Sequence, residues 1–600
     1  MADTEEAPPV ASGDEIKPYK IHVSSRYLDL TRQKLELTRL PHESTQPPSE
    51  DWWEPKPQVE PLIDFWLEKY SWREQEETLN KTPQFRTAIS TPSSEAPLRL
   101  HFIHAPSPHS HALPLLLIPP FPFSNLALAH LVKPFTEPED ASQDQPFHLV
   151  IPALPGLGFS DPFPNNTPVI PATAEMLNTL MLRLGYQHYL VSNSGAAQSS
   201  PARIDWKLVE SLSSAYPGAC LGAHLISPPL CSPKLSEAPL EWAKWTIATV
   251  LNAPILGYSK EDLSAHKQTA VALAQKKKAL TPSEFGLDNV GLKEPNTLAY
   301  AMCDSPTGLL VFALKGLRLL APRLPFTPEQ IITFTNLAWL PGPEYAMRFW
   351  AHCATHDNDN NNNARKEAAK KPATRPRVGI TVFLGETGTG GRSGGADTAA
   401  LPEGNERTVQ VDAPTKADAG AGYVCPAWAN AHYSVLFSQR AQGVPGLLAW
   451  ERPHVILTGL RGLAAEVLKA DGRLRASPAG ADTAPLEGVV SPGDAAAGAG
   501  EGGDDDGLKP PPRPILEQGD SSRTQVASQP PSSPKGKEPE IASPMASPIT
   551  AAADQDQNPG SPWAPAKGGE EEERSIREGT PDTVVLVTAP TPQEEEAVKK

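Results

Sequence analysis

The stretch Tyr189-Leu190-Val191-Ser192-Asn193-Ser194-Gly195-Ala196 decides how the rest of the chain is interpreted. Its apolar start is typical of the end of a buried strand, and small residues then lead toward a helix. Ser192 and Ala196 lie two positions before and two positions after Ser194. Small residues at those positions are typical of a sharp strand-to-helix turn that presents a nucleophile, because a bulky side chain would clash there. We therefore take Ser194 as the candidate nucleophile.

A plain polar loop is the other interpretation of this stretch, and the residues that follow favour it. Ser200 is suited to cap a helix, and Pro201 is suited to the first helical position. A turn that presents a nucleophile should lead into its helix almost at once, but Ala197-Gln198-Ser199 intervene. We therefore expect a looser turn than a working catalytic site needs.

The composition indicates a folded region joined to segments that bury no core. Only 39% of the 600 residues are hydrophobic, and 68 are prolines, which is more than a compact domain accommodates. Residues 470–600 are dominated by proline, alanine, glycine, serine and acidic residues, so we predict a disordered tail whose partner the sequence does not name. The net charge of −17 argues against nonspecific binding to nucleic acid.

Cysteine spacing and apolar runs bound the chemistry and the compartment. The five cysteines are scattered without a C-x-x-C pair, so neither a zinc site nor a disulfide framework is predicted, and we expect no other metal or cofactor. The first residues are acidic and lack the apolar stretch of a signal peptide. No run of about eighteen apolar residues predicts a membrane span. These absences lead us to expect a cytoplasmic protein.

Strands alternate with helices in the middle of the chain. This order is typical of an α/β fold with a mostly parallel sheet and helices on both faces. Besides the central strand, the expected strands are 16–23, 98–104, 113–118, 148–152, 221–226, 378–384 and 433–437. We expect a loose end at 1–15, a small N-terminal domain at 16–112, and the α/β domain at 113–469, which contains a helical insertion at about 232–350 and low-complexity inserts at about 356–377 and 387–422.

Several further stretches resemble a known family. Residues 70–76 (YSWREQE), with Leu79-Asn80 and Pro83-Gln84-Phe85, look like the N-terminal domain of the epoxide hydrolases of the microsomal type. Residues 154–160 (LPGLGFS) resemble L-P-G-Y-G-F-S of that family, and residues 304–309 (DSPTGL) resemble D-S-P-V-G-L of its lid. These stretches concern the scaffold rather than the chemistry.

The resemblance extends from about Lys17 to Leu468 and implies an α/β-hydrolase fold. It also implies that residues 232–350 form a helical lid over the site and that the reaction is the hydrolysis of an epoxide. In the family an aspartate attacks the epoxide carbon and forms an ester, which is hydrolysed by water that a histidine activates; an acid holds the histidine. Two lid tyrosines protonate the leaving oxygen, and an H-G-x-P turn holds the developing oxyanion.

The residues that this mechanism needs depart from the family together. The aspartate position falls on Ser194, and the histidine position falls on Gly446, which has no side chain to accept a proton. The acid position falls on Glu386 in Phe383-Leu384-Gly385-Glu386. The oxyanion turn becomes Pro119-Pro120-Phe121-Pro122, and proline has no backbone N–H to donate.

The lid positions and a second aspartate complete the comparison with the family. The tyrosine positions fall on Leu287 and Trp350, which are poor proton donors, while Tyr300 and Tyr345 remain elsewhere in the lid. Asp205-Trp206 looks like the family's Asp-Trp pair. It lies inside the predicted helix, beyond the turn, so we do not take it as the nucleophile.

Three functions remain open. A hydrolase whose activity is weak or lost, and which still binds a small apolar ligand under the lid, is favoured because the base and oxyanion donors are missing. An active, esterase-like hydrolase would use Ser194 and Glu386 with a relocated histidine. His432, before an expected strand, is the candidate, and His454 is the other histidine nearby. An interaction protein would act through the tail at 470–600.

Overall fold

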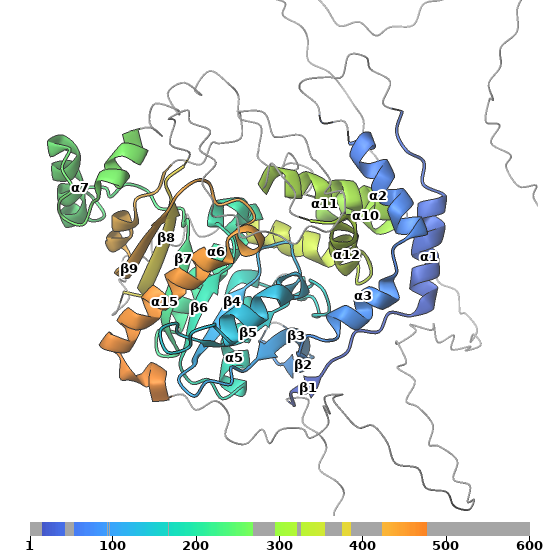
Figure 1. Cartoon of the computed structure of the whole chain (residues 1–600), viewed down its shortest axis with the longest axis horizontal. Coiled ribbons are helices and arrows are strands. Elements are labelled where there is room, and N and C mark those ends of the chain that lie inside the picture. Colours follow the sequence, from blue (N-terminus) through green and yellow to red (C-terminus); the bar gives the residue numbers. More distant parts are fainter. Residues whose placement is uncertain are drawn as a thin grey trace, which may run out of the picture. The chain divides into compact units, whose positions relative to one another are not determined.

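The computed structural model describes most of the chain before residue 477 (Figure 1). The described residues are 15–42, 53, 55–92, 94, 96–165, 167–267, 294–320, 326–354, 375–385 and 423–476. All of them belong to the first of two compact units, which spans Met1–Ser491. Outside the described residues lie 1–14, Leu287, Glu386, the insert 387–422, most of the insert 356–377 and nearly all of the tail 470–600.

Nine strands of the described chain form one sheet, in the order β1-β2-β3-β5-β4-β6-β7-β8-β9. The pairings from β1 to β5 by way of β2 and β3 are antiparallel, whereas every other pairing is parallel. This confirms the predicted α/β fold with a mostly parallel sheet. The strands are β1 Lys17–Pro18, β2 Gln84–Ile89, β3 Leu98–Ala105, β4 Leu113–Ile118, β5 Phe147–Pro152, β6 Tyr189–Asn193, β7 Cys220–Ile226, β8 Arg377–Phe383 and β9 Ser434–Ala441.

Helices cover both faces of the sheet. β4 is buried along its whole length, and its side chains alternate between two cores. Leu116 and Ile118 belong to the core that contains α5 (Val169–Arg183) and α6 (Ile204–Ala215), while Leu115 and Leu117 belong to the core that contains α15 (Pro453–Ala470). Alternate side chains of a strand point to opposite faces. A strand that is covered on both faces therefore has a continuous apolar sequence.

The N-terminal helices pack against helices of the predicted lid. α1 (Ser25–Glu36) and α2 (Lys56–Glu68) lie beside α10 (Pro295–Asp304), α11 (Pro306–Leu320) and α12 (Pro328–Trp339), as Figure 1 shows. Their shared core contains Leu62 and Trp66 of α2, Leu314 of α11 and Ile332 of α12. The shared core therefore stabilises both segments. The other α-helices that we name are α3 Trp72–Leu79, α4 Val132–Thr136, α7 Pro239–Leu251 and α14 Leu448–Glu451.

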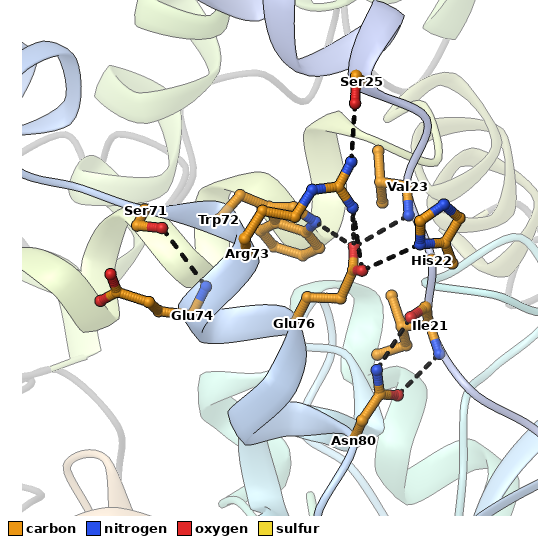
Figure 2. Close-up of polar contacts among 10 residues, drawn as sticks. All are labelled: Ile21, His22, Val23, Ser25, Ser71, Trp72, Arg73, Glu74, Glu76 and Asn80. Carbon is orange, nitrogen blue, oxygen red and sulfur yellow. Dashed lines mark hydrogen bonds and ion pairs between the residues drawn. The ribbon is translucent and has the colours of Figure 1, made fainter.

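A buried carboxylate fastens the start of the chain to α3. Glu76 is 7% exposed. Its carboxylate accepts hydrogen bonds from Trp72 Nε1 (2.8 Å), from the Val23 backbone N–H (3.0 Å) and from the Arg73 guanidinium (3.0 Å), as Figure 2 shows. Burial by itself would raise the pKa of Glu76, but the hydrogen bonds from Val23, Trp72 and Arg73 outweigh it and hold the pKa below its ordinary value. The stretch 70–76 thus has a structural role.

The N-terminal strand is shorter than the sequence predicts. Of the strand expected at 16–23, only Lys17–Pro18 belongs to β1. The Ile21 backbone instead donates to Asn80 Oδ1 (2.8 Å) and accepts from Asn80 Nδ2 (2.9 Å), which Figure 2 also shows. Side chains in α3 and next to it therefore form hydrogen bonds with the backbone groups that would have paired in a longer strand.

Candidate active site

Ser194 directly follows β6, where the parallel strands end. The residue is fully buried. Its hydroxyl donates to the Ile118 carbonyl oxygen (2.7 Å), and its backbone N–H donates to the same oxygen (3.2 Å). Ile118 is the last residue of β4, so this contact ties two neighbouring strands together. No histidine ring within the described ranges makes a hydrogen bond with Ser194, whereas a serine becomes a nucleophile only beside a base.

His432 lies at the opposite edge of the sheet. It is exposed and lies two residues before β9 begins at Ser434. Pairing across β6 to β9 aligns Val191, Ala223, Val378 and Val435 in one row. Ser194 lies three residues beyond this row and His432 three residues before it. At about 3.3 Å per residue and about 4.8 Å between strands, their backbones are roughly 20 Å apart along the strands and roughly 14 Å apart across them. The structure does not bring these two residues together.

The structure describes two of the three remaining positions that the sequence analysis considered. Glu386 lies outside the described residues, three positions after β8 ends at Phe383. Gly446 has a φ of 59°, and a Cβ at this position would meet Glu451 Oε2 at 2.3 Å. A backbone turn packed against Glu451 thus occupies the position where the family has its histidine. His454 lies in the first turn of α15 and is exposed.

A serine and a histidine do meet inside the sheet, although the sequence analysis did not single them out. Ser192 Oγ lies 2.9 Å from His224 Nδ1, and His224 Nε2 lies 2.8 Å from Thr381 Oγ1. All three residues are fully buried, and burial lowers the pKa of His224 to about 3, so its imidazole is neutral. A Cβ at Gly459 of α15 would meet His224 Nε2 at 2.2 Å. The pair therefore lies sealed beneath α15.

The helix after β6 begins later than the sequence predicts. Short 3₁₀ turns occupy Ala197–Ser199 and Pro201–Arg203, and α6 begins only at Ile204. Ala202 and Arg203 have φ values of 50° and 54°, a left-handed conformation through which an α-helix does not continue. Ser200 therefore does not cap α6, and its hydroxyl donates to Asp205 Oδ1 instead (2.7 Å).

This detour brings Asp205 to the turn Pro119-Pro120-Phe121-Pro122. Its Oδ1 also accepts the Phe121 backbone N–H (3.0 Å). Asp205 is fully buried, and burial raises its pKa to about 7 despite these hydrogen bonds. Its Oδ2 has no hydrogen-bond partner among the described residues. The backbone N–H of Phe121 is therefore a donor in this turn, but it already donates to the carboxyl group of Asp205.

An apolar cavity of about 150 Å³ lies between this turn and the helices of the lid. Phe121 and Phe123 of the turn, Phe312 of α11, Phe334 of α12 and Trp350 all line it. Neither Ser194 nor Asp205 belongs to its lining. The residues that form it come from both the α/β domain and the predicted lid, and the cavity is therefore the place where a ligand would be covered.

The lid tyrosines do not line this cavity. Trp350, at one of the two family positions, lines it and is 6% exposed. Tyr300 is 84% exposed, and Tyr345 is 36% exposed with its ring under the Arg348 guanidinium. The described lid thus places no tyrosine hydroxyl in the cavity wall.

Two further findings concern the described residues. They contain no group of three or more histidine, cysteine, aspartate or glutamate side chains placed to hold a metal ion. No single helix among them has both the length and the apolar character needed to cross a membrane; only α10 and most of α11 together reach this length and composition, as a pair bent by 117°.

Comparison with known proteins agrees with this architecture. The family model described as "Epoxide hydrolase N terminus" matches residues 16–128. The chain is 30% identical over 299 residues to "Putative epoxide hydrolase" of Stigmatella aurantiaca, a match that covers 49% of this chain and 58% of that protein. It is 26% identical over 326 residues to "Epoxide hydrolase 1" of Sus scrofa, covering 51% of this chain and 63% of that protein.

The fold also has a counterpart among solved structures. The crystal structure of juvenile hormone epoxide hydrolase from the silkworm Bombyx mori matches with a TM-score of 0.55 and 18% identity, covering 76% of this chain and 96% of that one. The chain is therefore similar to epoxide hydrolases in its N-terminal region and in its α/β fold, as the resemblance predicts. It matches only about three fifths of the length of the two curated relatives, 58% and 63%.

Proposed function

We propose that this chain is a member of the epoxide hydrolase family whose hydrolytic activity is weak or lost and whose cavity binds a small apolar ligand. The observation that carries the proposal is the Ser194 hydroxyl, which donates to the Ile118 carbonyl oxygen at 2.7 Å. A general base contributes about 10²–10⁴-fold to such a reaction, and an oxyanion donor about 10²–10³-fold. Without either contribution, little of the family's rate enhancement remains.

The other polar groups near the strand ends support the loss of activity. The imidazole of His224 is neutral and sealed beneath α15. The Asp205 carboxyl is fully buried and outside the cavity lining, so it presents no surface to an epoxide. The Phe121 N–H donates to Asp205 and is therefore not free for an oxyanion that would form on a substrate bound to Ser194.

The size and lining of the cavity support ligand binding. An apolar cavity of about 150 Å³ stays dry and accepts a molecule such as benzene. Transfer of apolar ligand surface from water into such a cavity is favourable by about 25 cal/mol per Å². We therefore propose a ligand that carries an apolar group of about the size of a benzene ring.

Turnover is tested with styrene oxide and a p-nitrophenyl ester, by quantifying diol and p-nitrophenol from the purified full chain and its Ser194→Ala variant. We expect no product above the rate of the variant. An esterase rate that falls in Ser194→Ala would instead support the alternative of an active serine hydrolase. Diol formation by both proteins would contradict the proposed loss of epoxide hydrolysis.

Ligand binding is tested with 3-phenylpropanamide by calorimetry and ligand-observed NMR. Gly316 of α11 lines the cavity, and a Cβ there would meet no atom within 4 Å. Gly316→Leu should weaken binding by about tenfold, or ~1.4 kcal/mol, without loss of thermal stability, because leucine favours a helix more than glycine does.

The matched control is Gly218→Leu, in an exposed turn with equal room for a side chain. It should bind the amide as the unmodified chain does. Equal binding by the two leucine variants would show that the ligand does not occupy this cavity.

A further inference from the structure

We propose, on the basis of the proposed function, that the natural ligand is an aromatic carboxylate whose ring enters the cavity and whose carboxylate pairs with Lys315 at its edge. The cavity wall supplies the argument for the ring, and the charge of α11 supplies the argument for the carboxylate. The two parts are independent, because one concerns the shape of the buried surface and the other concerns the only charge in the lining.

Five aromatic side chains take part in the wall of the cavity. Phe121, Phe123, Phe312, Phe334 and Trp350 line it from different elements. Phe123 and Phe334 already meet edge to face, with ring centroids 5.7 Å apart and planes at 90°. Aromatic rings attract one another in edge-to-face and offset arrangements beyond the gain from buried area. An aromatic ring is therefore the apolar group that this wall suits best.

Among the described residues, Lys315 is the only charged one that lines the cavity. It lies on α11 and is exposed. In the part of the chain that the structure describes, Lys315 forms no ion pair with a carboxylate. α11 contains Lys315 and Arg318 but no acidic residue. In a chain with a net charge of −17, this helix therefore presents a locally positive edge beside an apolar cavity.

The helix dipole explains only one of these two cations. Cations are favourable in the last turn of a helix, and the effect decreases sharply beyond that turn. Arg318 lies in the last turn of α11, and its guanidinium also lies over the Trp53 ring, 4.6 Å from the centroid. Lys315 lies outside the last turn, and an anionic ligand would give it a partner.

The polar groups of the wall fix the orientation of such a ligand. The hydroxyl of Ser124 donates to Asn125 (3.0 Å), and the hydroxyl of Thr335 donates to the Ile331 carbonyl (2.9 Å). Neither of these two hydroxyl protons is free for a carboxylate, and removing a carboxylate from water into an apolar cavity is strongly unfavourable unless it is paired. The ring must therefore enter first, and the carboxylate must remain at the solvent-exposed edge beside Lys315.

The test compares 3-phenylpropionate with 3-phenylpropanamide, which has the same ring and chain but no charge, on the full chain at low ionic strength. We expect the carboxylate to bind about twofold to fivefold more tightly, the range of an exposed ion pair. Added salt should remove this advantage because it screens exposed charges. Lys315→Met should abolish both the advantage and its salt dependence while leaving binding of the amide unchanged.

Lys133→Met is the matched control, since Lys133 is an exposed lysine on α4 outside the cavity lining. It makes the same change in net charge and should keep the preference for the carboxylate. If the unmodified chain binds both compounds equally, or if Lys315→Met keeps the preference, the inference is wrong while the proposed ligand site stands. If neither compound binds, the proposed function itself fails.

Discussion

Replacing Glu76 by glutamine should destabilise the folded chain by about 2 kcal/mol. The carboxylate accepts buried hydrogen bonds from Trp72 Nε1 and the Val23 backbone N–H. A hydrogen bond to a charged group contributes about 1.5–3 kcal/mol and a neutral one about 0.5–1.5 kcal/mol. Each of the two bonds therefore loses about 1 kcal/mol. Arg73 is 39% exposed in its side chain, so its share is small.

Glu76→Ala should be more severe than Glu76→Gln. Alanine leaves both donors without a partner, and an unpaired buried donor loses about 1–3 kcal/mol. The expected loss is therefore about 4 kcal/mol. Equilibrium unfolding in urea, followed by tryptophan fluorescence, measures both variants. Hydrogen exchange of residues 16–24 should show that this segment detaches first, because Glu76 holds its backbone.

Acid should remove the effect of the substitution. The folded-state pKa of Glu76 lies below its ordinary value of 4.5. A carboxyl group with a lowered pKa stabilises the fold above its unfolded pKa and loses that contribution as the pH falls through the folded pKa. The difference between the unmodified chain and Glu76→Gln should therefore be constant above about pH 5 and shrink as the pH falls below the ordinary value.

Glu77→Gln supplies the matched control. Glu77 is the next residue of the same helix and is exposed, so its substitution should change the free energy of unfolding by less than about 0.5 kcal/mol. If Glu76→Gln and Glu77→Gln unfold at the same urea concentration, the Glu76 hydrogen bonds do not hold the start of the chain, and the reasoning is refuted.

Three other substitutions test the candidate site. Ser194→Ala should lower the free energy of unfolding by about 1 kcal/mol, since it removes the hydrogen bond to the Ile118 carbonyl, and product formation measured in the same samples should not change. The free energy of unfolding of Asp205→Asn relative to the unmodified chain should rise by roughly 2.6 kcal/mol between pH 5 and pH 8 in urea unfolding. The reason is that burial raises the pKa of the Asp205 carboxyl to about 7, so that up to this pH the unfolded chain is ionised while the folded chain stays protonated; parallel curves for the two proteins would contradict the raised pKa. Gly459→Ala should destabilise the fold by about 3 kcal/mol, measured by thermal unfolding, because its Cβ would meet His224 Nε2 at 2.2 Å.

The layered fold could be predicted because burial on both faces leaves a continuous apolar sequence. β4 is such a run, and it is buried along its whole length. The start of the chain was predicted less well. Residues 16–23 alternate like a strand, but Asn80 and Glu76 bind the backbone beyond Pro18. A hydrogen bond from a side chain more than fifty residues away leaves no local pattern that distinguishes it from a sheet partner.

Only those features of the site that depend on local sequence could be predicted. The sequence indicated the turn after β6, and the resemblance assigns the family's histidine position to Gly446. The position of His432 could not be predicted, because it depends on which end of β9 lies at the same edge of the sheet as the end of β6. The pairing of Ser192 with His224 depends in the same way on the alignment of β6 with β7. Strand register across the sheet therefore decided which residues could meet.

The surroundings of Asp205 could not be predicted from the sequence. The chain reaches it through left-handed φ values at Ala202 and Arg203, which no residue type at those positions indicates. The same detour then carries its carboxyl to the Phe121 N–H and buries it. A site built on Ser194 would need this donor free for charge that develops on its substrate, whereas here the donor is bound by Asp205. At this edge of the sheet, the Ser194 hydroxyl and the Asp205 carboxyl thus both bind backbone groups of the protein itself.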